Sequence, residues 1–385
     1  MRALVLCDIG QLELREVPPP FVGTHDVLVR VSAVGVCGTD FHIFSGKANF
    51  NTDKRGKPIP LQDVPQILGH EIVGVVEEVG RFVEDLRVGD RVVLDQGLNC
   101  ISTLQQPLCE YCATGDSHQC QSFREYGITG LPGGFAEYVA IPAVNAIRIN
   151  SDLDNVEAVL TEPLGCIVHA SDMVARSRTR YVIGAEDSAR RVRSILIFGA
   201  GPAGLMFTQY LRNVLRYDGL LLVVEPNPRK RELAVSFGAE AIDPKAFDLL
   251  EVVQDKTSGR LVEYLIDASG AGSVFTSIPS MIRKQSTVLL YGLGHAGIDL
   301  SVLNNLQFIE PTLVAAIGAS GGFGPDGRPL TYRRSMSLIE AKQIEVASWI
   351  THRYHSLEAV RQAFTSDHQA NDYIKGVFVL QSRLT

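Results

Sequence analysis

The sequence lacks any long run of apolar residues. No stretch approaches the roughly 18 consecutive apolar residues of a membrane-spanning helix. The chain turns acidic at Asp8 after a few apolar or small residues, which is too short for the apolar core of a secretory signal peptide. A membrane partner is therefore not expected, and a reducing cytoplasm is the expected location.

Basic blocks, internal repeats and low-complexity tracts are missing as well. The 385 residues carry a net charge of −7, and their Lys and Arg residues gather in no stripe that could follow a nucleic-acid backbone. Nucleic acid is thus not an expected partner. With 45% hydrophobic and 21% charged residues the composition is that of a globular protein, and the length suits two domains.

The hydrophobic pattern changes character near residue 152. Before that point, short strands bounded by Pro or Gly predict a small, barrel-like β domain. These strands are expected at 1–7, 12–17, 26–34, 72–79, 91–95 and 135–141. Asp154 or Asn155 can then cap a helix that runs toward Ala175, in which Pro163 should cause a kink or a restart.

From residue 194 onward, strands alternate with helices, which predicts a parallel, doubly wound sheet. Strands are expected at 194–198, 220–225, 261–268 and 287–291, and helices at 204–216, 229–237 and 273–282. After about residue 320 the chain is expected to return to the first domain, with a helix at 335–342.

A glycine-rich turn follows the strand at 194–198 and opens a helix. It reads G-x-G-x-x-G, in which the glycines permit a tight turn and the helix N-terminus supplies N–H donors to a pyrophosphate. The alternative is an ordinary Gly-rich turn of an α/β domain. The cofactor-binding candidates here are Gly199, Gly201, Pro202, Ala203 and Gly204.

An acidic residue, Glu225, ends the next predicted strand. Its carboxylate would accept hydrogen bonds from the adenosine ribose hydroxyls and would repel a 2′-phosphate, which favours NAD over NADP. Arg229 and Lys230 lie close by in the sequence and leave NADP open as a cofactor.

Four of the seven cysteines cluster between positions 100 and 120. Cys109, Cys112 and Cys120 have the spacing of a zinc-binding lobe, and such clustering in a cytosolic protein favours metal over disulfides. Cys100 is the nearby candidate for a fourth ligand, because closing the longer loop between it and Cys109 costs little extra entropy. The site would be structural. The alternative is a set of free cysteines.

A thiolate, an imidazole and a carboxylate stand within the segment 37–71. Cys37, His70 and Glu71 are the ligand types that a catalytic zinc takes. Between them lie a hydroxyl, a second carboxylate and a second imidazole, which are the groups that metal-assisted proton removal from an alcohol needs. These interleaved side chains are Thr39, Asp40 and His42.

Together these motifs resemble the zinc-dependent medium-chain alcohol dehydrogenase superfamily, in its branch of polyol (sorbitol-like), L-threonine and sugar dehydrogenases. The resemblance covers nearly the whole chain. It implies an α/β protein with a GroES-like β-barrel-type catalytic domain at 1–168 and 320–385, and a Rossmann NAD-binding domain at 169–319. The segments that carry it are 35–40, 69–74, 88–92, the cysteine lobe, 133–138, 162–164, 199–204 and 267–270.

By this resemblance Cys37 and His70 are zinc ligands. Glu162 stands where the alcohol-dehydrogenase type has a second cysteine, as in the polyol and threonine branch. Glu71 and Glu162 are expected to share the remaining ligand role, directly or through a water molecule. Cys166 and His169, on the same predicted helix, are expected to pack rather than ligate.

The resemblance also implies a proton route. Thr39 would take the proton of the substrate alcohol and His42 would hand it to solvent, while Asp40 would orient a zinc-bound imidazole. The alternatives are that Thr39 and Asp40 only cap the following helix and that His42 is a surface residue. The segment 47–66 is longer than the family usually has beside its substrate cleft, and it would either recognise substrate or form a solvated loop.

The expected function is zinc-dependent oxidation of a secondary alcohol on a polyol, cyclitol or sugar, with NAD as hydride acceptor. An L-threonine 3-dehydrogenase-like oxidation of an amino alcohol is the closest alternative. A non-catalytic NAD-binding redox sensor is an alternative from a different class. The intact set of candidate ligands argues against it. A homo-oligomer, tetramer or dimer, is expected by resemblance.

Overall fold

The computed structural model describes residues 1–380, and the chain divides into two compact units. Unit 1 comprises Met1–Gly165, Ala319–Ala341 and the chain from Val346 onward, and unit 2 comprises Cys166–Gly318 and Lys342–Glu345. In the described part of the chain, no helix is long and apolar enough to cross a membrane.

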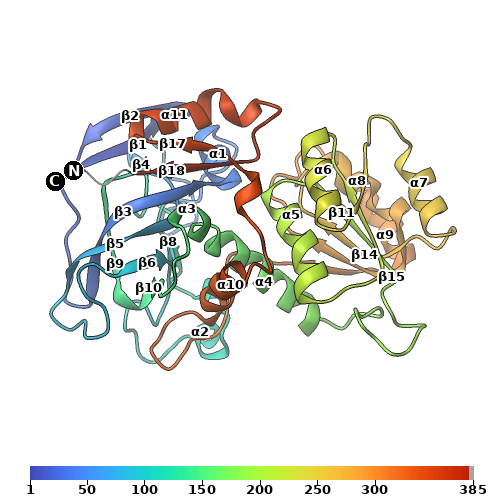
Figure 1. Cartoon of the computed structure of the whole chain (residues 1–385), viewed down its shortest axis with the longest axis horizontal. Helices are drawn as coiled ribbons and strands as arrows, with labels where there is room; N and C mark the ends of the chain where they lie inside the picture. The colour runs from blue at the N-terminus through green and yellow to red at the C-terminus, as the bar shows by residue number, and fades with distance from the viewer. Residues whose placement is uncertain (381–385) are drawn as a thin grey trace. The chain divides into compact units, whose positions relative to one another are not determined.

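Unit 1 is built on two main β-sheets (Figure 1). The smaller has the order β2-β1-β4, and the larger has the order β10-β6-β5-β3-β18-β17, with β9 also paired to β3. The strands of the smaller sheet are β1 (Arg2–Asp8), β2 (Gln11–Glu16) and β4 (Gln66–Ile67). Those of the larger are β3 (Asp26–Val36), β5 (Glu71–Val79), β6 (Arg91–Leu94), β9 (Tyr138–Pro142), β10 (Ala146–Arg148), β17 (Ile350–Tyr354) and β18 (Lys375–Val379). A short ribbon joins β7 (Gly97–Leu98) to β8 (Arg124–Glu125).

Strand β3 positions the chemistry of unit 1. Its antiparallel register with β5 places Gly35 opposite Glu71, and β18 runs along the same end of β3. Cys37 directly follows β3, and Lys375 is the first residue of β18. Residues separated by more than 300 positions therefore meet at one end of the sheet.

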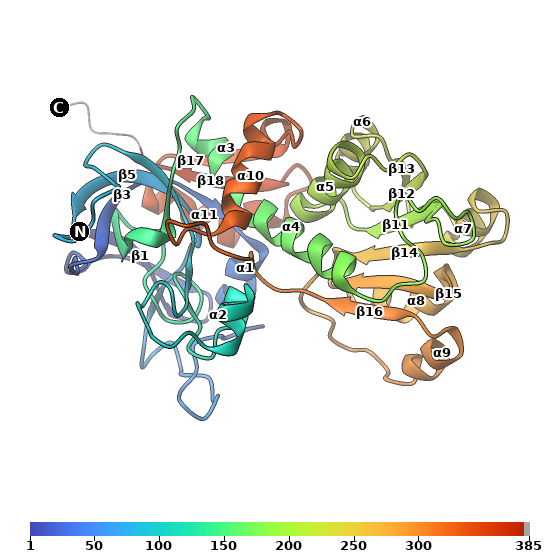
Figure 2. The ribbon, with the colours of Figure 1, turned by 90° about the horizontal axis from the view of Figure 1, so that it is seen from below.

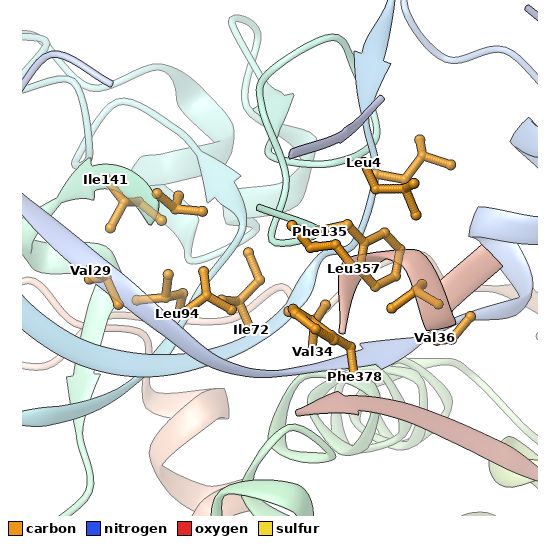
Figure 3. Packing of buried hydrophobic residues seen from close by; sticks show 14 of the residues in the cluster. Leu4, Val29, Val34, Val36, Ile72, Leu94, Phe135, Ile141, Leu357 and Phe378 are labelled. Carbon is orange, nitrogen blue, oxygen red and sulfur yellow. The ribbon is translucent and has the colours of Figure 1, made fainter. Parts of the chain in front are cut away.

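The core of unit 1 lies between these sheets and helix α11 (Leu357–Thr365). Figure 3 shows Leu4 of β1, Val34 of β3, Phe135, Leu357 of α11 and Phe378 of β18 converging in it. Each is at most 2% exposed, and burying a side chain of this size contributes about 1.5–3 kcal/mol. Segments from both ends of the chain thus share one core.

Helices of unit 1 connect these strands. They are α1 (Gly38–Phe44), α2 (Glu110–Thr114), α3 (Asn155–Ala158), α10 (Leu330–Glu340) and α11, and α4 (Thr161–Arg176) leads from unit 1 into unit 2. Asp154 caps α3 by accepting the N–H of Val156 at 2.8 Å. The helix then stops and restarts as α4 with Pro163 in its first turn, where the missing N–H of proline costs nothing. The predicted restart at Pro163 is confirmed.

Unit 2 is a parallel sheet of six strands in the order β13-β12-β11-β14-β15-β16, which is the doubly wound arrangement predicted from the sequence. The strands are β11 (Ser194–Phe198), β12 (Leu220–Val224), β13 (Glu240–Ile242), β14 (Val262–Asp267), β15 (Ile282–Leu290) and β16 (Thr312–Ala315). The helices are α5 (Pro202–Gln209), α6 (Pro228–Ser236), α7 (Leu249–Lys256), α8 (Gly272–Met281) and α9 (Val302–Ile309). Helices α5 and α6 cover one face of the sheet and α8 and α9 the other (Figure 2).

Four elements of unit 2 were not predicted: β13, α7, α9 and β16. The two strands are only three and four residues long and lie at the sheet edges, where half-exposed side chains give no continuous apolar run. The helix predicted at 204–216 is α5 followed by a π-helical turn, Tyr210–Val214. At this turn Gln209 exchanges two hydrogen bonds with the backbone of Glu345, at 2.8 and 2.7 Å.

Candidate active site and metal centres

Cys37 is the N-cap of helix α1, and Asp40 lies in the first turn. Oδ2 of Asp40 accepts the backbone N–H of Cys37 at 2.9 Å. Its Oδ1 accepts the N–H of Gly69 at 3.2 Å and lies 3.4 Å from Nδ1 of His70. One fully buried carboxylate therefore caps the helix and also faces the imidazole, so the two interpretations of Asp40 are compatible.

Glu71 and Lys375 form a buried ion pair. Nζ of Lys375 lies 2.6 Å from Oε1 of Glu71, and the side chains are 3% and 0% exposed. Burial acts to lower the pKa of Lys375. The negative charges around it, chiefly those of Glu71 and Cys37, together outweigh this effect, so the pKa lies above its ordinary value. Oε2 of Glu71 has no hydrogen-bond partner among the described residues, and it fits only because residue 35 is glycine: an added Cβ there would lie 1.8 Å from it.

The ligand atoms of Cys37, His70 and Glu71 lie within 4.8 Å of one another. Because His70 turns Nδ1 toward Asp40, its Nε2 remains for a metal. Burial lowers the pKa of His70, yet the negative charges of Asp40 and Cys37 raise it well above its ordinary value. A thiolate, an imidazole and a carboxylate with one unpartnered oxygen, in so negative a setting, fit a zinc ion.

Glu162 is the second residue of α4 and is 4% exposed. Nε2 of Gln96 donates to its Oε1 at 2.9 Å, and the hydroxyl of Tyr332 donates in turn to Oε1 of Gln96. Because Tyr332 belongs to α10, this hydrogen-bond chain joins three separate segments of unit 1. Glu162 lies outside the group of three ligand atoms that converge within 4.8 Å.

Two more acidic side chains lie beside this chain of hydrogen bonds, the buried Asp95 and the half-buried Glu125. Burial raises the pKa of Glu125, whereas the charges of His118 and His70 and a hydrogen bond with Gln96 act in the opposite direction. Oδ1 of Asp95 lies 3.8 Å from Nε2 of the buried His118. The environment is rich in carboxylates, which accept hydrogen bonds from hydroxyls and repel anions.

Thr39 and His42 lie three residues apart on α1 and hence on one face of the helix. Both are half-buried. Burial and then the charge of Lys47 lower the pKa of His42, so its imidazole is neutral at pH 7 and can accept a proton.

The segment 47–66 folds back on itself. The N–H of Asp53 donates to the carbonyl of Lys57 at 2.9 Å, and Oδ1 of Asp53 accepts the N–H of Arg55 at 2.8 Å. The side chains at this tip are exposed. Asn51, in contrast, is buried beside Gly130, where an added Cβ would lie 2.6 Å from its Oδ1. The segment thus has an anchored base and a solvated tip.

The four clustered cysteines converge as the spacing predicts. The Sγ atoms of Cys100 and Cys120 lie 3.7 Å apart, and those of Cys109 and Cys120 lie 3.9 Å apart. Four sulfurs at about 2.3 Å from a tetrahedral zinc stand about 3.8 Å from one another, far beyond a disulfide length of about 2.05 Å. The backbone N–H of Cys112 lowers the pKa of Cys109 to about 6, which favours the thiolate that binds metal. All four residues are buried, and they fit a closed zinc site.

In unit 2 the Gly-rich turn connects β11 to α5, with Gly201 as N-cap and Pro202 as the first helical residue. Gly204 must lack a side chain, because an added Cβ would lie 1.9 Å from the carbonyl oxygen of Gly199. The carboxylate of Glu225 accepts the N–H of Ala200, within this turn, at 2.8 Å. The predicted acidic residue therefore lies directly at the turn.

The basic residues after Glu225 differ in placement. Arg229 is exposed and Lys230 is half-buried on α6. Arg231, which sequence reasoning missed, donates to the backbone carbonyl of Glu225 at 2.8 Å and pairs with Asp243 at 2.9 Å. Arg231 thus braces the strand end that carries the acidic residue.

Sequence reasoning also missed Lys375, Gln96 and Tyr332. No local pattern marks them, because each reaches the site only through the pairing of distant strands and helices. The sequence held one signal of this site, the glycine at position 35, which opens the segment 35–40. The Glu71 side chain requires a glycine there, because an added Cβ would lie 1.8 Å from its Oε2.

A doubly wound sheet with a dinucleotide turn, together with a β unit that carries a zinc-type ligand group, defines a zinc-dependent dehydrogenase. Two family models match the chain: the alcohol dehydrogenase GroES-like domain at residues 23–151 and the zinc-binding dehydrogenase domain at residues 202–340. The L-threonine 3-dehydrogenase of Pyrococcus abyssi is 32% identical over 357 residues, which cover 91% of this chain and 90% of that one. The sorbitol dehydrogenase of Arabidopsis thaliana is 27% identical over 383 residues, which cover 97% and 94%.

Among solved structures, a protein from Sinorhizobium meliloti 1021 determined bound to NADP matches with a TM-score of 0.77 at 26% identity, over 98% of each chain. The chain belongs to the zinc-dependent medium-chain dehydrogenase superfamily. It is an NAD(P)-dependent alcohol or polyol-type dehydrogenase. Its cofactors are NAD(P) and zinc, with a four-cysteine structural cluster and a Cys/His/Glu catalytic site.

Proposed function

We propose that this enzyme oxidises a secondary alcohol of a polyol, cyclitol or sugar with NAD. The observation that supports this most is the set of buried and half-buried carboxylates in and around the candidate zinc site. Several hydroxyls of one substrate can donate to such groups, and an oxygen-rich site suits a substrate that approaches the metal through two oxygens. An amino-acid substrate would bring a carboxylate that these groups repel. The carboxylates are the buried Glu71, Asp95 and Glu162 and the half-buried Glu125.

Cys37, His70 and Glu71 are the proposed zinc ligands, and Glu162 completes the site directly or through a water molecule. Bound zinc supplies Lewis acidity, which lowers the pKa of a coordinated alcohol. The protein's own part is to orient the ligands and to move the proton from substrate to solvent. Thr39 and His42, on one face of α1, are the proposed route.

Two measurements test this assignment. Cys37→Ala should abolish turnover and leave NADH binding unchanged, because unit 2 carries the proposed dinucleotide residues. Substrates should then be screened by following NADH formation with polyols, inositols, aldoses and L-threonine. A polyol, cyclitol or sugar should give the highest kcat/KM, and turnover that survives in Cys37→Ala would exclude the zinc mechanism.

The curated relatives favour a second candidate, oxidation of an L-threonine-like amino alcohol. The same carboxylates could accept hydrogen bonds from an ammonium group. The substrate carboxylate would need a cation, and Lys375 is already paired with Glu71. Lys47, whose charge acts on His42, is the candidate partner. A kcat/KM for L-threonine more than tenfold above that of every polyol, lost in Lys47→Ala, would establish this candidate and overturn the first.

The proposed preference for NAD over NADP rests on Glu225. Its buried carboxylate lies at the dinucleotide turn, where a 2′-phosphate would meet its charge. The enzyme should show at least about tenfold higher kcat/KM with NAD than with NADP, a difference of about 1.4 kcal/mol. Glu225→Gln should narrow that ratio. A clear preference of the wild type for NADP would reverse the assignment.

We infer a homo-oligomer, dimer or tetramer, built on the edge of the unit 2 sheet. Strand β16 leaves one row of backbone groups open at this edge, and Leu313 and Ile317 there are 45% and 64% exposed. If β16 paired with the β16 of a second subunit about a two-fold axis, the open backbone groups and the two exposed side chains would be covered. Light scattering should show a dimer or larger, and Leu313→Lys should weaken it. Phe247→Lys, at an apolar position that is 60% exposed and lies away from this edge, is the control.

A further inference from the structure

Three loops of unit 2 meet at the carboxyl ends of β11, β14 and β15. An added Cβ at Gly199 would lie 3.5 Å from the backbone of Ala268, so the dinucleotide turn packs against the loop that follows β14. That loop packs in turn against the loop after β15, because an added Cβ at Gly270 would lie 2.3 Å from the carbonyl oxygen of Leu293. Ligands of doubly wound sheets bind at such a switch point.

A dinucleotide bound as proposed would cross this point in a known direction. Glu225, at the end of β12, would hold the adenosine ribose, and the N-terminus of α5 would hold the diphosphate. Strands β12 and β14 lie on opposite sides of β11. The nicotinamide half must therefore extend toward the ends of β14 and β15.

An imidazole and a buried carboxylate are paired at that place. Nε2 of His295, in the loop after β15, lies 2.7 Å from Oδ2 of Asp267, the last residue of β14, and the side chains are 22% and 0% exposed. Oδ1 of Asp267 accepts the N–H and the hydroxyl of Ser269 at 2.9 and 2.7 Å. The rings of Phe275 and His295 are arranged edge-on, with their centroids 5.7 Å apart. The imidazole is thus held at one nitrogen and braced by a ring, yet it remains partly exposed.

The chemistry of the pair determines what the other nitrogen offers. A carboxylate oxygen accepts a hydrogen bond from an imidazole N–H, so the tautomer that fits the 2.7 Å contact has its proton on Nε2 and leaves Nδ1 as an acceptor. The residues from 292 to 297 read Gly-Leu-Gly-His-Ala-Gly. His295 is therefore the one side chain of this stretch that can form a hydrogen bond.

We propose that His295 is a cofactor-binding residue whose Nδ1 accepts a hydrogen bond from the nicotinamide–ribose half of the dinucleotide, and that Asp267 positions it. This inference rests on the proposed placement of the cofactor at Glu225 and the Gly-rich turn. Both the ribose hydroxyls and the carboxamide NH₂ of that half are suitable donors. The adenosine half makes no contact with His295.

Two substitutions separate this contact from the anchoring of the loop. Gln places its amide nitrogen where Nε2 stands, so His295→Gln keeps a donor for Asp267 but has no group at Nδ1. His295→Ala removes both groups. Asp267 is left unchanged, because its second oxygen also holds the turn at Ser269. His355→Gln is the control, since His355 is exposed and belongs to unit 1.

Isothermal titration of the zinc-loaded full chain with NADH and with ADP tests the proposal, because ADP carries the adenosine half without the nicotinamide–ribose. His295→Gln and His295→Ala should both weaken NADH binding roughly threefold to tenfold, the scale of one lost hydrogen bond. ADP binding should change less than about twofold, and the control should match the wild type for both ligands.

Three outcomes would overturn the proposal. NADH binding by His295→Gln at wild-type strength would show that Nδ1 makes no contact. An equal loss for ADP and NADH would show that His295 only supports the loop. A wild-type chain that binds NADH but not ADP would contradict the proposed placement of the adenosine half, and the role of His295 would fall with it. In the first two outcomes that placement survives, and only the role given to His295 is wrong.

Discussion

Replacing Lys375 with methionine should destabilise the metal-free protein by about 3–5 kcal/mol. Methionine has nearly the length of lysine without its charge, so the substitution leaves the buried carboxylate of Glu71 without its cation, which now lies 2.6 Å away. Removing one partner of a buried ion pair has a cost of this size because the other charge stays buried and uncompensated. Zinc would restore positive charge beside Glu71, so the loss should be smaller in the zinc-loaded protein.

Urea unfolding, with and without saturating zinc, measures this loss as a change in the free energy of unfolding. The chain offers a matched control in Lys256→Met. Nζ of Lys256 also lies 2.6 Å from a carboxylate oxygen, that of Glu240, but these side chains are 45% and 53% exposed. Exposed pairs contribute little, so this substitution should give no measurable change.

The result that would refute the reasoning is a loss for Lys375→Met that is no larger than that of the control. The pair would then have no role in stability beyond that of a surface contact. An equal loss with and without zinc would show instead that Glu71 does not share its charge with the metal, and would remove it from the proposed ligand set.

Three further predictions concern the metals and the proton route. Metal analysis should give two zinc ions per chain, and Cys109→Ser should lower the count to one with NADH binding retained; one zinc in the wild type would exclude one site. His42→Ala should slow turnover most at low pH. Because burial and Lys47 lower the pKa of His42, the wild-type imidazole still accepts protons at a pH where a free histidine is already charged. At high pH, solvent bases can take over its role in the variant. A pH–rate profile unchanged from the wild type would rule out the relay. Tyr332→Phe should lower kcat about threefold to tenfold at constant NADH affinity, because Gln96 loses the hydroxyl that holds it against Glu162; an unchanged kcat would contradict this.

The features predicted well from the sequence are those that local spacing controls. The glycines of the dinucleotide turn follow from the close approach of backbone at Gly204, and the cysteine lobe follows from the geometry of a tetrahedral ion. Strand β11 and the restart at Pro163 likewise depend on near neighbours in the chain. In each case the physical constraint acts within about 20 residues, so its pattern can be read directly.

The features that were missed depend on contacts across the fold. Lys375 lies 304 positions from Glu71, and Tyr332 lies 236 positions from Gln96. A lone lysine before an apolar strand indicates nothing by itself, because its meaning comes from the register that brings β18 beside β3. The partners of a buried charge can be deduced only once the sheet order is known.

The contact of Asp40 with Gly69 closes a loop of the chain, since it joins residues 29 positions apart on either side of the segment 47–66. The entropy of closing such a loop grows only slowly with its length: doubling the number of residues costs about 0.6 kcal/mol. The Asp40 carboxylate thus makes the positions of the metal ligands independent of the segment 47–66 that lies between them. The intervening segment is free to lengthen, shorten or change its charge as an enzyme acquires a new substrate, and the metal centre need not be rebuilt each time.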